Sequence, residues 1–152
     1  MDVFAFLKAN PVMRGFTDDG IRIIQSVVAP RQLEPGQPVF VEKMMGESAF
    51  LLGHGEVSVH CKGTRGVERE IGTLFAPDIF GELSLLQPGP RRVSVKARTQ
   101  CLLFEIPRRD FLRLQGHRPQ ACFKLVANLT EGFAMKAAAS SGALEKLCDA
   151  FL

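Results

Sequence analysis

The sequence predicts an α+β domain in which a β-sandwich, barrel or jelly roll lies between two helical segments. Apolar residues recur at helical spacing before residue 30 and again after residue 106. Between these segments, short apolar runs alternate with glycine and proline turn signals about every 8–12 residues, which is typical of many short strands. The length of 152 residues fits one ordinary domain with a core of its own.

The first segment, residues 1–29, is predicted to be helical. Thr17 is the expected N-cap of its main helix, because a threonine hydroxyl accepts a hydrogen bond from a first-turn N–H group and two aspartates follow it. A shorter helix is expected before it, ending near Ala9. The apolar face of the main helix consists of Ile21, Ile24, Val27 and Val28.

The second segment, residues 30–106, is predicted to consist of β-strands. Turn signals such as Pro35-Gly36 and Gly53-His54-Gly55 separate its apolar and alternating runs. No repeated motif or low-complexity linker divides it, so we expect a single unit. The predicted strands cover residues 38–41, 49–52, 56–61, 68–75, 93–98 and 101–106.

The third segment, residues 107–140, returns to helical patterning. A short helix is expected around Phe111, and Pro119 suits the first turn of a longer helix, where a missing N–H group leaves no hydrogen bond unmade. The stretch "AAASSG" at 137–142 is expected to end that helix. The remaining residues, 141–152, are predicted to form a short amphipathic tail whose apolar face holds Leu144, Leu147, Cys148 and Phe151.

The composition limits the function classes. A net charge of +3 does not by itself indicate nucleic-acid binding. No run approaches the ~20 apolar residues that span a bilayer, and the start "MDVFAFLKAN" lacks the basic region of a signal peptide. We therefore expect no membrane span and a cytoplasmic location. The four cysteines form no C-x-x-C pair and are expected to be reduced and partly buried.

Metal and catalytic sites have little support in the residue pattern. The histidines at 54, 60 and 117 form no His-x-His pair and have no nearby acid at ligand spacing, so no metal is expected. Ser94 lies in the middle of a predicted strand and Cys61 has no base partner, so no catalytic residue is predicted. A metal-dependent jelly-roll enzyme stays open as one hypothesis, beside the two that are described below.

The stretch "FGELSLLQPGPRRVSV" at 80–95 carries the chemistry that does point to a ligand. Gly81 lets the backbone approach a ligand closely, and a helical turn over 82–86 would direct free N–H groups toward an anion. The Pro-Gly-Pro corner then places Arg91, whose guanidinium fork can hold a phosphate. Glu82 can accept hydrogen bonds from sugar hydroxyls. This combination predicts a small anionic sugar phosphate. The structural alternative is an ion pair between Glu82 and Arg91 across a loop.

The stretch "FGELSLLQPGPRRVSVKA" at 80–97 resembles the phosphate-binding cassette of cyclic nucleotide-binding domains, as found in catabolite-activator-type regulators and kinase regulatory subunits. The segment 33–60 follows the strand and glycine pattern of that family, and "RRDFLRL" at 108–114 resembles its hinge. The resemblance covers residues 1–140. It implies an antiparallel β-roll (jelly roll) flanked by N-terminal helices and by a C-terminal hinge plus long helix.

The resemblance also implies roles for individual residues. Gly81, Glu82 and Leu83 match the Gly-Glu-Leu of the cassette, with Glu82 expected on the ribose 2′-hydroxyl. Arg91 matches the arginine that pairs with the cyclic phosphate, since anchoring on the following strand selects it over the adjacent Arg92. The expected ligand-binding residues are Phe80, Gly81, Glu82, Leu83, Ser84, Arg91, Arg92 and Val93.

The chain departs from the family pattern at Arg92, which stands where the family usually has Ser, Thr or Ala. A second guanidinium there adds phosphate affinity, faces solvent or indicates a different ligand. The threonine or serine that helps to select guanine is missing, so cAMP is the first expected ligand and cGMP the second; no cofactor is expected. Counting along the long helix from Pro119 places Met135, Lys136 and Ser140 near the base.

The expected function is a non-enzymatic cyclic nucleotide sensor. Ligand binding would pull the cassette and the hinge at 107–115 inward and reposition the helix at 119–140. A homodimer or a protein partner is expected to use residues 119–152. The residues after the long helix are too few for a helix-turn-helix domain, so no direct nucleic-acid binding is expected. Two explanations stay open: the protein acts through a partner, or the chain is a fragment of a longer polypeptide. The rival is a ligand-free protein-interaction module with a degenerate nucleotide pocket.

Overall fold

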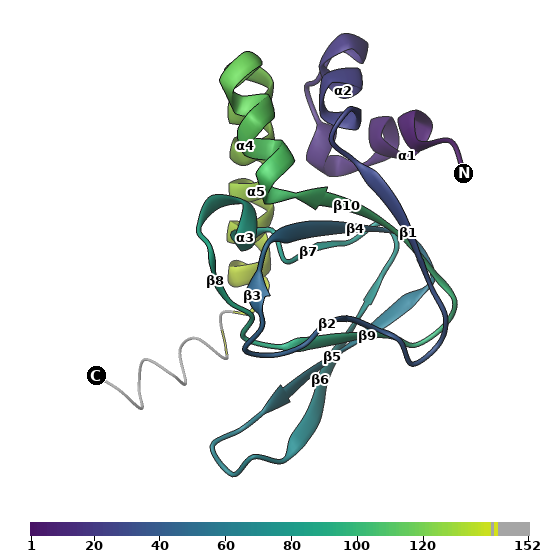
Figure 1. Cartoon of the computed structure of the whole chain (residues 1–152), viewed down its shortest axis with the longest axis vertical. Helices are drawn as coiled ribbons and strands as arrows, with labels where there is room; N and C mark the ends of the chain where they lie inside the picture. Colours follow the sequence, from purple (N-terminus) through teal and green to yellow (C-terminus); the bar gives the residue numbers. More distant parts are fainter. Residues whose placement is uncertain (141, 143–152) are drawn as a thin grey trace.

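Two four-stranded antiparallel sheets form a β-roll, and the helices pack at one end of it (Figure 1). The computed structural model describes residues 1–140 and 142. One sheet has the strand order β1-β10-β4-β7, the other β2-β9-β5-β6, and β3 pairs with β8. The strands are β1 (Ala29–Leu33), β2 (Pro38–Phe40), β3 (Met45–Gly46), β4 (Ser48–His54), β5 (Glu56–Lys62), β6 (Glu68–Phe75), β7 (Ile79–Phe80), β8 (Gly89–Pro90), β9 (Ser94–Ala97) and β10 (Cys101–Pro107).

The N-terminal helices form where side chains cap them. The Thr17 hydroxyl accepts a hydrogen bond from the Gly20 N–H at 3.1 Å, which confirms the predicted N-cap. The predicted helical segment is too long, however, because the main helix ends at Gln25 and the backbone from Ala29 onward pairs with β10. The three elements are α1 (Val3–Ala9), the 3-10 helix η1 (Pro11–Met13) and α2 (Asp18–Gln25).

All six predicted strands are present, as β2, β4, β5, β6, β9 and β10. The four strands that the sequence did not predict are β1, β3, β7 and β8. In β1, "APRQL" contains a proline and polar residues, which are tolerated because this strand lies at the sheet edge and pairs only with β10. The other three have two residues each, which is too short for a period-2 pattern to appear.

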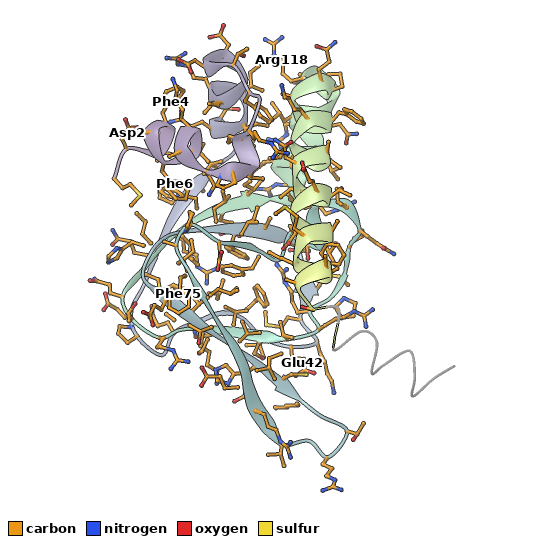
Figure 2. All side chains as sticks on the ribbon, turned by 180° about the vertical axis from the view of Figure 1, so that it is seen from behind. Asp2, Phe4, Phe6, Glu42, Phe75 and Arg118 are labelled. Atoms are coloured by element: carbon orange, nitrogen blue, oxygen red, sulfur yellow. The ribbon has the colours of Figure 1, made fainter. Side chains whose placement is uncertain are left out.

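The core has two parts. One lies between the helices and the first sheet and includes Leu7, Ile24, Leu51, Ile106 and Leu125. Phe6 of α1 is partly buried and packs against this part (Figure 2), with its ring centroid 4.7 Å from that of Phe104. The other part fills the interior of the roll and includes Phe40, Phe50, Phe80, Val95 and Leu103. This inner part forms the floor of the candidate site.

The C-terminal helices are α3 (Leu83–Leu86), α4 (Arg108–His117) and α5 (Pro119–Ala139). Pro119 begins α5 and the helix ends within 137–142, as the sequence predicts. The Asn128 amide of α5 donates to the carbonyls of Val12 at 2.7 Å and Arg14 at 3.0 Å, which holds the helix against η1. In the part of the chain that the structure describes, no helix is both long and apolar enough to cross a bilayer. Apart from residue 142, the predicted tail at 141–152 lies outside the described residues.

Candidate functional site

The cassette connects β7 to β9 and folds against β3 and β4. Phe80 ends β7, and its ring stacks on that of Phe50 with centroids 5.6 Å apart. Gly81 follows with a φ of +69°, and a Cβ at this position would lie 2.7 Å from Arg91 Nη1. Glycine is therefore required here both by the backbone conformation and by the close approach of the arginine. The predicted helical turn follows as α3.

Arg91 is buried, with an exposed fraction of 9%. Its Nη1 donates to Ser84 Oγ at 2.9 Å and to the Gly81 carbonyl at 3.3 Å, and its Nη2 donates to the Ser48 carbonyl at 2.6 Å. The guanidinium also lies over the Phe40 ring, 4.0 Å from the centroid. Burial lowers the pKa of Arg91 while the negative charge of Glu105 raises it. The group remains cationic at neutral pH, as arginine does in proteins.

The hydrogen-bond acceptors of Arg91 among the described residues include no carboxylate. Each hydrogen-bond acceptor is a neutral carbonyl or hydroxyl oxygen, and the buried Nε has no partner among the described residues. Within residues 1–140 and 142, no carboxylate lies within salt-bridge distance of Arg91, and Glu82 pairs with a different cation. The simple ion pair between Glu82 and Arg91 is therefore not formed. A buried cation with a spare donor suits an anionic ligand.

Glu82 is the second charged residue of the cassette, and only 8% of it is exposed. Its Oε1 accepts a hydrogen bond from Lys136 Nζ at 3.1 Å. The same ammonium donates to the Ile79 carbonyl at 2.6 Å. The C-terminal half of α5 is therefore attached directly to the cassette, and one of the three residues expected near the base touches the residue expected on the ribose.

The remaining predicted residues divide into two groups. Ser84 is buried and accepts from Arg91, and Val93 packs against the inner core. Leu83 is 53% exposed although it belongs to the cassette, and Met135 of α5 is 68% exposed. Arg92 and Ser140 are exposed as well. The structure thus brings together Phe80, Gly81, Glu82, Ser84, Arg91, Val93 and Lys136, although the Lys136 side chain is also 47% exposed. Leu83, Arg92, Met135 and Ser140 are in contact with solvent.

Sequence reasoning missed four residues that shape the site. Phe40 supports the guanidinium, Ser48 accepts from it through a backbone carbonyl, and Glu105 acts on it through charge. At Gly46, a Cβ would lie 2.2 Å from Ser84 Oγ and 3.1 Å from Arg91 Nε, so any larger residue would clash with the Ser84 and Arg91 side chains. None of these contacts has a local signal, because each depends on how strands pair across the roll.

The surface of the described part of the chain also carries two hollows, and neither contains the charged residues of the cassette. In residues 1–140 and 142, no three His, Cys, Asp or Glu side chains gather where they could hold a metal ion. A hollow of about 510 Å³ lies between α2 and the junction of α4 and α5, and one of about 280 Å³ lies among α3, α4 and α5. Neither is lined by Glu82 or Arg91.

Comparison with known families is consistent with this geometry. The family model for the cyclic nucleotide-binding domain matches residues 30–118, which is more than half of the chain and includes the whole cassette. The chain belongs to the cyclic nucleotide-binding domain family. The family expected from the cassette and the predicted β-roll are both confirmed.

This cyclic nucleotide-binding domain has curated relatives of known class. It is 28% identical over 123 residues to the cyclic AMP receptor protein of Thermus thermophilus, covering 81% of this chain and 57% of that protein. It is 32% identical over 111 residues to the cAMP-dependent protein kinase regulatory subunit of Yarrowia lipolytica, covering 73% of this chain and 29% of that one. The chain thus spans 57% of the length of the first relative and 29% of the length of the second.

A solved structure supports the fold independently. The cyclic nucleotide-binding domain of Methylobacillus flagellatus superimposes with a TM-score of 0.83 over 94% of this chain and 83% of that one. Their sequences are 21% identical, so this similarity concerns the fold alone.

Proposed function

We propose that this cyclic nucleotide-binding domain is a non-enzymatic sensor whose ligand is a cyclic nucleotide, cAMP first and cGMP second. In this proposal, Arg91 pairs with the cyclic phosphate and Glu82 accepts a hydrogen bond from the ribose 2′-hydroxyl. The observation that carries it is the buried guanidinium of Arg91, whose Nε has no partner among residues 1–140 and 142 and whose other nitrogens donate to neutral acceptors. A phosphate would supply the missing negative charge through charge-assisted hydrogen bonds.

The preference for cAMP rests on two points. Arg92 takes the place of the serine or threonine that helps to select guanine, and its side chain is exposed. Two curated relatives carry cyclic AMP or cAMP in their names. Both points concern only the choice between adenine and guanine. The proposed contacts of Arg91 with the phosphate and of Glu82 with the ribose would be the same for cGMP.

The output of the sensor is proposed to pass through α5. A ribose hydroxyl on Glu82 would compete with Lys136 for the same carboxylate, and this would change the attachment of the helix to the cassette. The ligand can shift the position of α5 only by as much as its affinity differs between the two positions. We propose that residues 119–152 carry the signal to a second copy or to a protein partner, since Phe123, Phe133 and Met135 of α5 are exposed apolar residues.

Isothermal titration calorimetry with cAMP, cGMP, a cyclic dinucleotide and 5′-AMP tests the proposal. We expect saturable binding of cAMP, weaker binding of cGMP and little heat from 5′-AMP. Binding should also raise the melting temperature, because a ligand that binds only the folded state stabilises it. If no cyclic nucleotide binds at millimolar concentration, the ligand-free interaction module replaces the sensor.

A further inference from the structure

Ser48 and Glu105 form a hydrogen-bonded chain behind Arg91. The Ser48 hydroxyl donates to Glu105 Oε1 at 2.5 Å, and the Ser48 carbonyl accepts from Arg91 Nη2 at 2.6 Å. In the register of β4 and β10, Glu105 is opposite Phe50 and Ser48 is opposite Pro107. Glu105 and Ser48 are therefore diagonal neighbours on one face of the sheet, close enough for their side chains to meet.

The position of the Glu105 charge matters for an anion site. A carboxylate in direct contact with Arg91 would occupy the donors that a phosphate needs. Glu105 instead acts on the guanidinium through its charge, and the atom that touches Arg91 is the neutral Ser48 carbonyl. The buried cation is thus partly balanced, while its Nε has no hydrogen-bond partner in the part of the chain that the structure describes.

We propose that Ser48 and Glu105 are positioning residues for Arg91. Glu105 fixes the first residue of β4 through the Ser48 hydroxyl, and the Ser48 carbonyl then fixes the plane of the guanidinium. Gly46 and Phe40 bound the same guanidinium on other sides, so its orientation is set by neighbours rather than by the ligand. The value of this orientation for binding rests on the proposed function, in which Arg91 holds the cyclic phosphate.

The test uses Ser48→Ala, which removes the hydroxyl and keeps the carbonyl, and Glu105→Ala, which removes the acceptor. Each should weaken cAMP binding about threefold to tenfold, in keeping with the loss of one hydrogen bond. The double variant should be no worse than either single one, because both break the same link. Glu105→Gln keeps an acceptor for Ser48 and should bind within about threefold of wild type.

Two comparisons separate positioning from general stability. Ser58→Ala removes an equally buried hydroxyl from β5, with Ser58 8% and Ser48 7% exposed, and should lower the melting temperature without weakening binding. In an Arg91→Lys background, Ser48→Ala should lower the melting temperature as before but cause no further loss of affinity. A loss of the same size in both backgrounds, or cAMP affinity within twofold of wild type in both alanine variants, overturns the proposal.

A readout without ligand keeps this proposal separate from the sensor function. The Nε–Hε signal of Arg91 in ¹⁵N NMR, assigned by its disappearance in Arg91→Lys, should shift and broaden in Ser48→Ala and Glu105→Ala but not in Ser58→Ala. If wild type binds no cyclic nucleotide and the signal still responds in this way, the sensor function fails and positioning holds. If the signal is the same in every variant, positioning fails.

Discussion

Lys136 Nζ donates a hydrogen bond to Glu82 Oε1 at 3.1 Å, and the two residues are 54 positions apart in the chain. The pair is asymmetric, since the side chain of Glu82 is 10% exposed and that of Lys136 is 47% exposed. The desolvated carboxylate therefore depends on its partner more than the lysine does. A ligand hydroxyl that approached Glu82 would meet a site already connected to the long helix α5.

Glu82→Gln tests the importance of this carboxylate for the ligand. The amide oxygen still accepts one hydroxyl, but the charge is gone, so we expect cAMP affinity to fall on the order of tenfold. Glu34→Gln, which changes an exposed acid in a turn outside the cassette, should leave affinity unchanged. Calorimetry measures both; an unchanged affinity in Glu82→Gln would mean that the ribose does not use this residue.

Arg91 and the adjacent Arg92 should differ strongly in their effect on binding. Arg91→Lys keeps a cation but loses the planar fork, and we expect affinity to fall by about tenfold to a hundredfold. Arg92→Ala removes an exposed side chain and should change affinity by less than about threefold. Calorimetry on the two variants checks the alignment of the cassette. A damaging Arg92→Ala beside a mild Arg91→Lys would place the phosphate arginine one residue later.

Two glycines with positive φ separate backbone strain from crowding. Gly36 has a φ of +86°, and beyond its two chain neighbours no atom of the described residues lies within 4 Å of a built Cβ, whereas a Cβ on Gly81 would lie 2.7 Å from Arg91 Nη1. Gly36→Ala should lower the free energy of unfolding by about 1–2 kcal/mol through φ alone. Gly81→Ala should lower it further and also weaken ligand binding, because Arg91 must move. Equal urea midpoints and an intact affinity in both variants would contradict the geometry of the cassette.

A pH effect is expected at the contact between α1 and α2. Lys8 Nζ lies 2.8 Å from Asp18 Oδ1, and this hydrogen bond lowers the pKa of Asp18 below its ordinary 3.8 despite the opposing effect of desolvation. Because the folded pKa is the lower one, the stabilisation is present above the unfolded pKa and is lost as the pH falls through the folded pKa. Lys8→Met should therefore be slightly less stable than wild type at pH 6.

The urea midpoints of wild type and Lys8→Met should converge as the pH falls through the folded pKa of Asp18, because the carboxyl is then protonated in both. The difference at pH 6 should be small, since both side chains are about half exposed and water screens the pair. A difference that stayed the same at both pH values would show that Lys8 stabilises the protein through its stem and not through Asp18.

The exposed apolar residues of α5 should matter for assembly. Phe123 is 75% exposed, and we expect Phe123→Ser to reduce formation of a homodimer or capture of a protein partner. Light scattering after gel filtration detects a mass above the 16.7 kDa of one chain, and pull-down detects a partner. Ile71→Ser, at a 61% exposed apolar residue of β6, is the matched control. If both variants behave like wild type, α5 does not carry the interface through Phe123.

Local signals made much of this fold predictable. The cap at Thr17, the proline that begins α5 and the turn glycines each act within a few residues, and so the elements next to them could be predicted from the sequence. The cassette motif indicated the family for the same reason, since Gly81, Glu82 and Arg91 lie within eleven positions of one another. Counting along α5 placed Met135, Lys136 and Ser140 near the base, which stays a prediction; of these, Lys136 contacts Glu82 and Met135 is exposed.

The tertiary structure alone decided how Arg91 is held. Its acceptor on Ser48 is a backbone carbonyl, which every residue type carries, and Glu105 reaches it through the register of β4 and β10. The two-residue strands β3, β7 and β8 are defined by their pairing, β3 with β8 and β7 with β4. A residue pattern records which side chains favour a helix or a strand. It does not specify which strands pair with each other, and this strand pairing places the acceptors around Arg91.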